Sequence, residues 1–182
     1  MLIEPLKLNG TFKITLEPKR DHRGYFARAY DRNIFAENGL VTDWVQENQS
    51  RSLEKDTVRG LHFQNPPFFE TKLVRAVRGA ILDAFVDLRK GSSTYGQWDS
   101  LELSEDNLVF VYIPRGFAHG FRTLTDDSVV QYKVDNVFSP EHDNGIFWND
   151  DEIGIDWGVS DPIVSEKDSR LPRLRDLANP FD

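Results

Sequence analysis

Short apolar runs separated by turn residues dominate this chain, and they constrain its fold more than any other feature. Each run has the length of a β-strand and most are rich in β-branched or aromatic residues. The runs that we expect to form strands are Phe12–Leu16, Trp44–Asn48, Val58–Phe63, Leu73–Val77, Ala80–Leu88, Leu108–Ile113 and Val129–Val134. Strands at a spacing of about ten residues predict an all-β sandwich, jelly roll or barrel.

Two of these runs indicate how their strands are covered. In Val129–Val134 the even-numbered residues share one face, so Tyr132 points inward while Gln131 and Lys133 point outward. The run Ile81–Leu88 is largely apolar at both parities, which is typical of a strand covered on both faces.

Few segments favour a helix. Asp31–Asn38 starts with a residue able to cap a helix and is followed by Gly39, so we expect a short helix there. Ser165–Asp168 has the spacing of a capping box and can open a last helical turn. The stretch Asp135–Asp161 is rich in Asp, Asn and Gly and is predicted to be mostly loop.

Composition narrows the functional class. The chain has 182 residues, the length of one domain, and its 13 Phe, 5 Tyr and 4 Trp exclude a disordered chain. Acidic residues outnumber basic ones 30 to 22, and no run of Lys or Arg offers a positive face, so we expect no nucleic-acid partner. The absence of cysteine excludes disulfides, thiolate metal sites and cysteine nucleophiles.

The apolar residues of the first segment are interrupted by charges at Glu4, Lys7 and Lys13, so no signal-peptide core forms over Met1–Leu16. No stretch approaches the ~20 apolar residues that span a membrane. We therefore expect a cytoplasmic protein without a membrane partner.

One histidine stands beside cations. A histidine between apolar neighbours is often a satisfied core or turn residue, and that reading is open for His62. However, His62 and Gln64 share a strand face, and Arg59 and Lys72 flank them. The second reading is a titratable base next to groups that can hold an anion.

The segment Pro114–His119 has the pattern Pro-x-Gly-x-x-His, which resembles the second motif of cupin barrels. Metal-binding cupins add His-x-His and a Glu from their first motif. Here the first motif reads His62-Phe63-Gln64, and Glu70 alone does not complete a set of three ligands, so we expect no metal.

A closer resemblance is carried by several segments in a fixed order. They are Asp21–Phe26, Gln46–Ser50, Arg59–Gln64, Lys72–Val74, Val86–Arg89, Gly116–Phe121, Gly145–Trp148 and Ser165–Asp168. Together they resemble the dTDP-4-dehydrorhamnose 3,5-epimerase family of cupins, from about Phe12 to Asp168. The resemblance implies a cupin-type jelly roll or barrel that inverts C3 and C5 of a nucleotide-linked 4-keto-6-deoxyhexose, without a cofactor.

The resemblance also assigns the chemistry. His62 matches the general base, Asp168 the carboxylate that orients it, Lys72 the cation beside the C4 oxygen, and Tyr132 the acid that returns a proton. Each has a purely structural alternative: Asp168 as a capping-box acid, Lys72 as a solvated strand-end lysine, and Tyr132 as a core aromatic.

Further residues match positions that bind the substrate. The resemblance assigns Arg23, Arg59 and Lys167 to the diphosphate, Gln46 and Asn48 to the sugar or nucleotide, Phe138 to stacking on the base, Phe26 to the binding surface and His119 to a place near the sugar. Any of the cations can equally be a surface charge.

Two positions depart from the family's pattern. Arg28 stands where a Glu often reads the thymine, and Asp143 where a Glu commonly contacts the ligand. A guanidinium carries donors only, so Arg28 cannot accept from a base N–H. We therefore hypothesise that Arg28 turns to a phosphate or that the site tolerates several bases.

The family resemblance implies a homodimer in which an N-terminal strand is exchanged and both chains line each site. We expect a C-terminal tail over about residues 169–182. The alternatives are a mono-epimerase, an epimerase for another nucleotide's sugar, a metal-dependent cupin dioxygenase or isomerase, and a non-catalytic cupin that binds sugar nucleotides. The product would feed deoxysugar synthesis.

Overall fold

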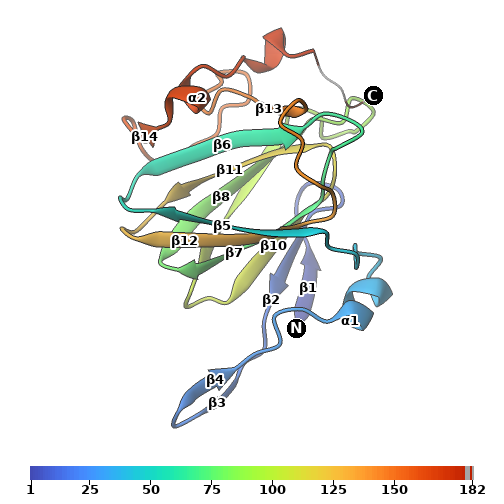
Figure 1. Ribbon diagram of the computed structural model, residues 1–182, viewed down its shortest axis with the longest axis vertical. Coiled ribbons are helices and arrows are strands. Elements are labelled where there is room, and N and C mark those ends of the chain that lie inside the picture. The colour runs from blue at the N-terminus through green and yellow to red at the C-terminus, as the bar shows by residue number, and fades with distance from the viewer. Residues whose placement is uncertain (179–180, 182) are drawn as a thin grey trace.

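The computed structural model describes residues 1–178 and 181, and two antiparallel sheets face one another in it (Figure 1). The first has the order β1 (Leu2–Pro5), β2 (Phe12–Thr15), β10 (Val109–Ile113), β7 (Lys72–Arg78), β12 (Ser128–Val134), β5 (Gln46–Ser52). The second has the order β13 (Asp143–Gly145), β6 (Thr57–Gln64), β11 (Phe117–Thr123), β8 (Ala80–Asp87), β9 (Trp98–Ser104), with β14 (Ile163–Val164) parallel to β6. This confirms the all-β prediction, and the two packed sheets form a jelly roll.

Every predicted apolar run contributes to a strand, and only β5 differs from its predicted limits by more than one residue at an end. β5 begins at Gln46 and extends to Ser52, past the predicted end at Asn48, because its pairing with β12 continues through polar residues. All seven residues of β5 are polar, and Ser50 lines a cavity, so the hydrophobic pattern stops before the strand does. Two further strands were not among the predicted apolar runs. β9 is an edge strand with several polar residues, and β11 is interrupted by His119, Gly120 and Arg122.

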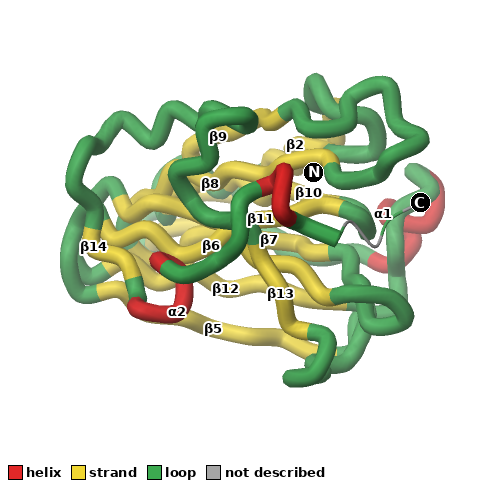
Figure 2. The backbone as a smooth tube through the Cα atoms, turned by 90° about the horizontal axis from the view of Figure 1, so that it is seen from above, coloured by secondary structure: helices red, strands yellow, loops and turns green. Residues whose placement is uncertain are grey.

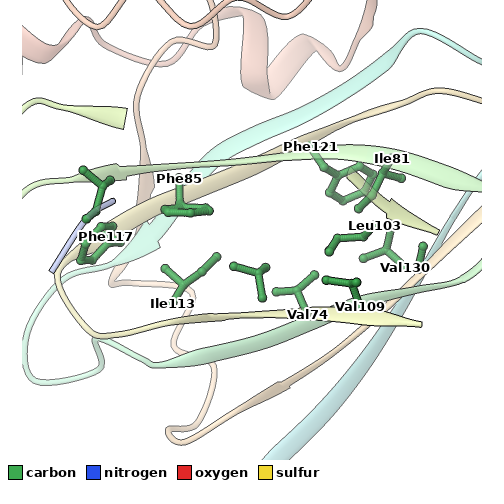
Figure 3. Close-up of a cluster of buried hydrophobic side chains, with 12 residues drawn as sticks. Val74, Ile81, Phe85, Leu103, Val109, Ile113, Phe117, Phe121 and Val130 are labelled. Atoms are coloured by element: carbon green, nitrogen blue, oxygen red, sulfur yellow. The ribbon is translucent and has the colours of Figure 1, made fainter. Parts of the chain in front are cut away.

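The main core lies between the two sheets (Figure 3). The side chains labelled there are Val74, Ile81, Phe85, Leu103, Val109, Ile113, Phe117, Phe121 and Val130. Complete burial of one such side chain stabilises the fold by about 1.5–3 kcal/mol. On β8, Ile81 and Phe85 face this core, whereas Ala84 and Val86 face a second cluster behind the sheet, which confirms that this strand is covered on both faces.

The outer faces of the sheets are covered by segments from opposite ends of the chain. Phe35 of α1 (Arg32–Glu37) packs in a cluster on the first sheet. The C-terminal segment covers the second sheet with Ile153 and Trp157, and from above α2 (Glu166–Ser169) lies over β6 (Figure 2). This covering segment brings Asp168 to the inner strands.

Both predicted helices are confirmed. The Asp31 side chain accepts hydrogen bonds from the N–H groups of Asn33 and Ile34 and so caps α1. Ser165 caps α2 by accepting from the Asp168 N–H group. No helix among the described residues combines the length and apolar character that crossing a membrane requires.

Two peripheral segments stand apart from the sheets. The hairpin of β3 (Lys19–Asp21) and β4 (Gly24–Phe26) projects away from them with all six strand residues exposed (Figure 1). Of the predicted C-terminal tail, residues 179, 180 and 182 lie outside the described part. Its other residues include a 3-10 turn, Leu174–Asp176, and Phe181, whose ring contacts that of Phe63.

Candidate active site

A cavity of about 530 Å³ opens between the sheets. Strands β5, β7 and β12 of the first sheet and β6 and β11 of the second contribute to its walls, and the segment from β14 to α2 forms its rim. Its lining residues are Ser50, Thr57, Val58, Arg59, His62, Lys72, His119, Gly120, Phe121, Tyr132, Ile163, Val164, Ser165, Lys167 and Asp168. All four residues that we expected to be catalytic thus lie in one cavity.

His62 and Asp168 form a hydrogen-bonded pair in this cavity. His62 Nε2 lies 2.8 Å from Asp168 Oδ1, and Asp168 Oδ2 accepts from the Gly60 N–H group at 3.1 Å. The His62 side chain is 34% exposed, whereas Asp168 is buried. Burial raises the pKa of Asp168, but the hydrogen bond and charge of His62 and the Gly60 N–H group outweigh it, so this pKa lies below its ordinary value. Because its carboxylate turns to His62, Asp168 does more than occupy a capping box.

Gly60 makes this pair possible where β6 pairs closely with β11. Its φ is +123°, and a Cβ atom there would lie 2.6 Å from the Gly120 Cα atom and 2.8 Å from the His119 carbonyl oxygen. No L side chain fits such a contact in that conformation. The glycine therefore lets the backbone turn its N–H group to the Asp168 carboxylate.

Lys72 is buried beside the same pair. Its Nζ atom donates to the His62 carbonyl oxygen at 3.5 Å and lies 3.4 Å from Glu70 Oε1, and its side chain is 9% exposed. This placement contradicts the alternative of a solvated strand-end lysine. A buried ammonium group in the cavity wall can stabilise negative charge that develops on a bound molecule.

Tyr132 reaches the cavity from the opposite sheet. It lies on β12, opposite Asn48 of β5, while His62 lies on β6. Burial raises the pKa of Tyr132 above its usual value, and the charges of Glu70 and Asp143 raise it further against the opposing effect of Arg59. The phenol is therefore protonated at neutral pH and can donate a proton, although its ring also packs against the main core.

A second carboxylate–imidazole pair lies deeper in the cavity. His119 Nε2 is 2.8 Å from Asp83 Oδ2, and Asp83 is fully buried. Burial raises the pKa of Asp83, while the charges of His119 and Lys72 act against this rise. Asp83 was missed by the sequence analysis, although an acidic residue in a strand covered on both faces was the available signal.

The cavity mouth carries two of the expected phosphate ligands. Arg59 Nε donates to Ser52 Oγ at 3.0 Å, and one of its terminal nitrogens donates to the Arg51 carbonyl oxygen. Lys167 forms an ion pair with Asp143. Both cations are exposed at this rim, where an anionic group can reach them.

Three further predicted residues lie outside the cavity lining, near the ends of β5 and β12. Gln46 Oε1 accepts from the Phe138 N–H group at 2.8 Å, and the Phe138 side chain is largely exposed. Asn48 is two residues further along β5.

Arg23, Phe26 and Arg28 are not brought to the cavity within this chain. Arg23 and Phe26 lie on the projecting hairpin, where Arg23 binds Asp21. Arg28 Nη1 lies 3.0 Å from the capping carboxylate of Asp31.

Each of the cavity's two imidazoles is paired with a carboxylate. The Nε2 atoms of His62 and His119 each face a carboxylate, and the Lys72 ammonium group lies between the sheets beside them. Among the residues that the structure describes, no group of three or more His, Cys, Asp or Glu side chains could hold a metal ion.

Comparison with known proteins extends these observations. The family model described as dTDP-4-dehydrorhamnose 3,5-epimerase matches residues 5–176. A dTDP-4-dehydrorhamnose 3,5-epimerase from Methanothermobacter thermautotrophicus is 47% identical over 172 residues, which cover 93% of this chain and 92% of the relative. A dTDP-4-dehydrorhamnose 3-epimerase from Streptomyces niveus is 37% identical, over 92% of this chain and 81% of its own.

The fold agrees with that of a solved relative. The structure of dTDP-4-dehydrorhamnose 3,5-epimerase from Bacillus anthracis, with TDP and PPi bound, matches with a TM-score of 0.93 and 42% identity, covering 95% of this chain and 99% of that chain. The jelly roll is thus of the cupin type, as predicted. By sequence and by fold, this chain belongs to the dTDP-4-dehydrorhamnose 3,5-epimerase family.

Proposed function

We propose that this protein is an isomerase that inverts C3 and C5 of dTDP-4-dehydro-6-deoxy-D-glucose to give dTDP-4-dehydro-L-rhamnose. The observation that carries the proposal is the placement of His62 and Tyr132 on opposite walls of one cavity, with Lys72 beside His62. Family membership supports the same reaction.

The reaction follows from what these groups can do. His62 removes the proton from a carbon next to the C4 ketone, and the electron pair of that C–H bond moves into an enolate. Lys72 stabilises the negative charge on the C4 oxygen, while Asp168 stabilises the imidazolium. Tyr132 then gives its proton to the opposite face of the carbon and recovers one from solvent, while the His62 imidazolium releases its proton to solvent.

Other residues would hold the rest of the substrate. Arg59 and Lys167 at the cavity mouth suit a diphosphate, since Arg can bind two phosphate oxygens at once. The Gln46 amide nitrogen and the Asn48 amide can donate to the sugar or nucleotide, and Phe138 offers an exposed ring to the base. His119 would contact the sugar from the cavity floor.

Deuterium exchange tests the proposal directly. We expect the protein, incubated in D2O with the dTDP-linked 4-keto sugar, to incorporate deuterium at both C3 and C5, as followed by NMR. Exchange at C3 alone would favour the second candidate, a mono-epimerase, which the similarity to the 3-epimerase from Streptomyces niveus supports. Binding of the sugar nucleotide without deuterium exchange would instead indicate a non-catalytic sugar-nucleotide-binding protein.

We further propose that the working site is formed by two chains. Arg23 and Phe26 lie on a hairpin that projects from its own barrel, and the aromatic side chains of Tyr25 and Phe26 are more than half exposed. Exposed aromatic rings on a projecting segment are typical of a contact surface. A hairpin from a second copy would add its cations and rings to the nucleotide end of the cavity.

The dimer proposal predicts complementation. We expect a mixture of His62→Asn and Arg23→Ala chains, denatured and refolded together, to regain activity that neither variant shows alone, because mixed dimers hold one site with both residues intact. Sedimentation should give twice the mass of the chain. A fully active monomer would contradict the proposal.

Arg28 leads to a prediction about the nucleotide. Because Arg28 cannot accept from a base N–H group, we expect dTDP and UDP to bind within about tenfold of each other, or ~1.4 kcal/mol. Arg28→Glu should shift the preference toward dTDP, whereas Arg32→Glu, the same charge change on an exposed residue of α1, should not. Calorimetric titration of both nucleotides measures this, and a wild-type preference for dTDP above about a hundredfold would refute the prediction.

A further inference from the structure

An exposed aromatic residue near the cavity is carried on a firmly held backbone. Phe138 is 56% exposed. Its N–H group donates to Gln46 Oε1 at 2.8 Å, the carbonyl oxygen of Val137 accepts from Gln64 Nε2 at 3.2 Å, and the Ser139 N–H group donates to Gln64 Oε1 at 2.7 Å. Side chains from β5 and β6 thus fix three consecutive residues of this loop.

Gln64 is the central group in this arrangement. It lies two residues after His62 on β6 and is 3% exposed. Besides Val137, its Nε2 atom donates to the Phe68 carbonyl oxygen at 2.9 Å and to Glu70 Oε2 at 2.8 Å.

The hydrogen bonds of Gln64 allow one orientation of its amide. Rotating the amide by half a turn would place its NH2 group against the Ser139 N–H donor and its oxygen against the Glu70 carboxylate. Both contacts would be repulsive, and in a buried position they would cost more than at the surface. The amide is therefore locked, and it holds the Val137 carbonyl oxygen and the Ser139 N–H group against the end of β6.

The same side chain is linked to the reacting end of the cavity. Glu70, which accepts from Gln64 through Oε2, lies 3.4 Å from Lys72 Nζ through Oε1. One locked amide thus connects the backbone on either side of Phe138 to the ion pair beside His62.

A fixed backbone under an exposed ring favours stacking of a flat ligand. The ring of Phe138 exposes apolar surface to solvent, and the fold gains little from that exposure. A ligand that stacks on a ring already held in place avoids the cost of ordering a loop when it binds.

We propose that Gln64 is a positioning residue: it holds the Val137–Ser139 backbone so that the Phe138 ring is presented to the nucleotide base. This inference rests on the proposed function, which supplies the nucleotide. Gln64 does not touch the reacting carbons, and it acts on binding through Phe138.

A double-mutant cycle tests this with dTDP alone, which lacks the keto sugar and so leaves the role of Lys72 unmeasured. Base–aromatic stacking contributes ~1–3 kcal/mol. We expect Phe138→Ala and Gln64→Leu each to weaken dTDP binding by about tenfold in calorimetric titration. The double variant should bind no more weakly than Phe138→Ala. Losses that multiply to about a hundredfold would overturn the proposal, because Gln64 would then act independently of the ring.

Two variants complete the design. Gln64→Glu keeps an oxygen that accepts from the Ser139 N–H group but loses the amide donor to the Val137 carbonyl oxygen. We expect this variant to weaken dTDP binding in the wild-type background and to have no further effect when Phe138 is already alanine. It decides the question if Gln64→Leu does not fold, as judged by thermal unfolding. Gln49→Leu, at an exposed glutamine of β5, should bind dTDP as the wild type does.

Deuterium exchange by the wild-type protein separates the two proposals. If the wild type exchanges and binds dTDP but Gln64→Leu binds it equally well, the role of Gln64 is refuted and the proposed function stands. If the wild type neither exchanges deuterium nor binds dTDP, both are refuted.

Discussion

Replacing His62 with asparagine is expected to abolish deuterium exchange at both C3 and C5 while dTDP binding stays nearly unchanged. General-base catalysis contributes roughly 10²–10⁴-fold to a rate, and an amide cannot take up the proton that the imidazole removes. Because one base faces the substrate from β6, both carbons should lose exchange together.

The controls for His62→Asn follow from its neighbours. Asp168 keeps its hydrogen bond from the Gly60 N–H group in the variant, so we expect a thermal unfolding curve close to that of the wild type. dTDP titration serves as the internal control for an intact cavity mouth. Exchange at either carbon above roughly a tenth of the wild-type rate would assign the base to another residue.

Tyr132→Phe is expected to impair net epimerisation more than exchange. Burial raises the pKa of Tyr132 above its ordinary value, so the wild-type phenol carries its proton throughout the neutral range. Without the phenol, His62 can still remove a proton and return deuterium to the same face. The ratio of inverted product to incorporated deuterium, measured by NMR, should therefore fall by more than about tenfold.

Tyr95→Phe is the matched control, because Tyr95 is an exposed tyrosine outside the cavity lining, and its ratio should equal that of the wild type. Equal loss of exchange and inversion in Tyr132→Phe would instead mean that Tyr132 supports enolate formation or folding. A tyrosine with a structural role alone would leave the ratio unchanged.

The strands could be predicted from the sequence wherever one face of the strand packs in an apolar core. Alternation in Val129–Val134 predicted both the strand and the inward direction of Tyr132, since Val130 and Val134 are buried. The prediction ended early in β5, where the residues are polar and Ser50 lines the cavity. Hydrophobic periodicity reports packing, so it weakens where a strand faces a site.

Prediction of the candidate site residues depended on resemblance to a family and not on hydrophobic periodicity. His62 and Asp168 were paired by resemblance to a family, because no local pattern relates residues so far apart. Glu70 was considered only as a metal ligand, and its contacts with Lys72 and Gln64 emerge when β6 and β7 are placed in space. Asp83 and the close approach of Gly60 to Gly120 likewise follow from the pairing of β11 with β8 and β6.

The origin of Asp168 in the C-terminal covering segment has a consequence for the folding of the chain. His62 and Asp168 are separated by 106 positions, and closing so long a loop is entropically unfavourable until other contacts hold its ends together. The two sheets can pair before this segment docks through β14 onto the edge of β6. During refolding, the return of catalytic activity therefore reports the arrival of the last segment, while circular dichroism of the sheets reports an earlier event.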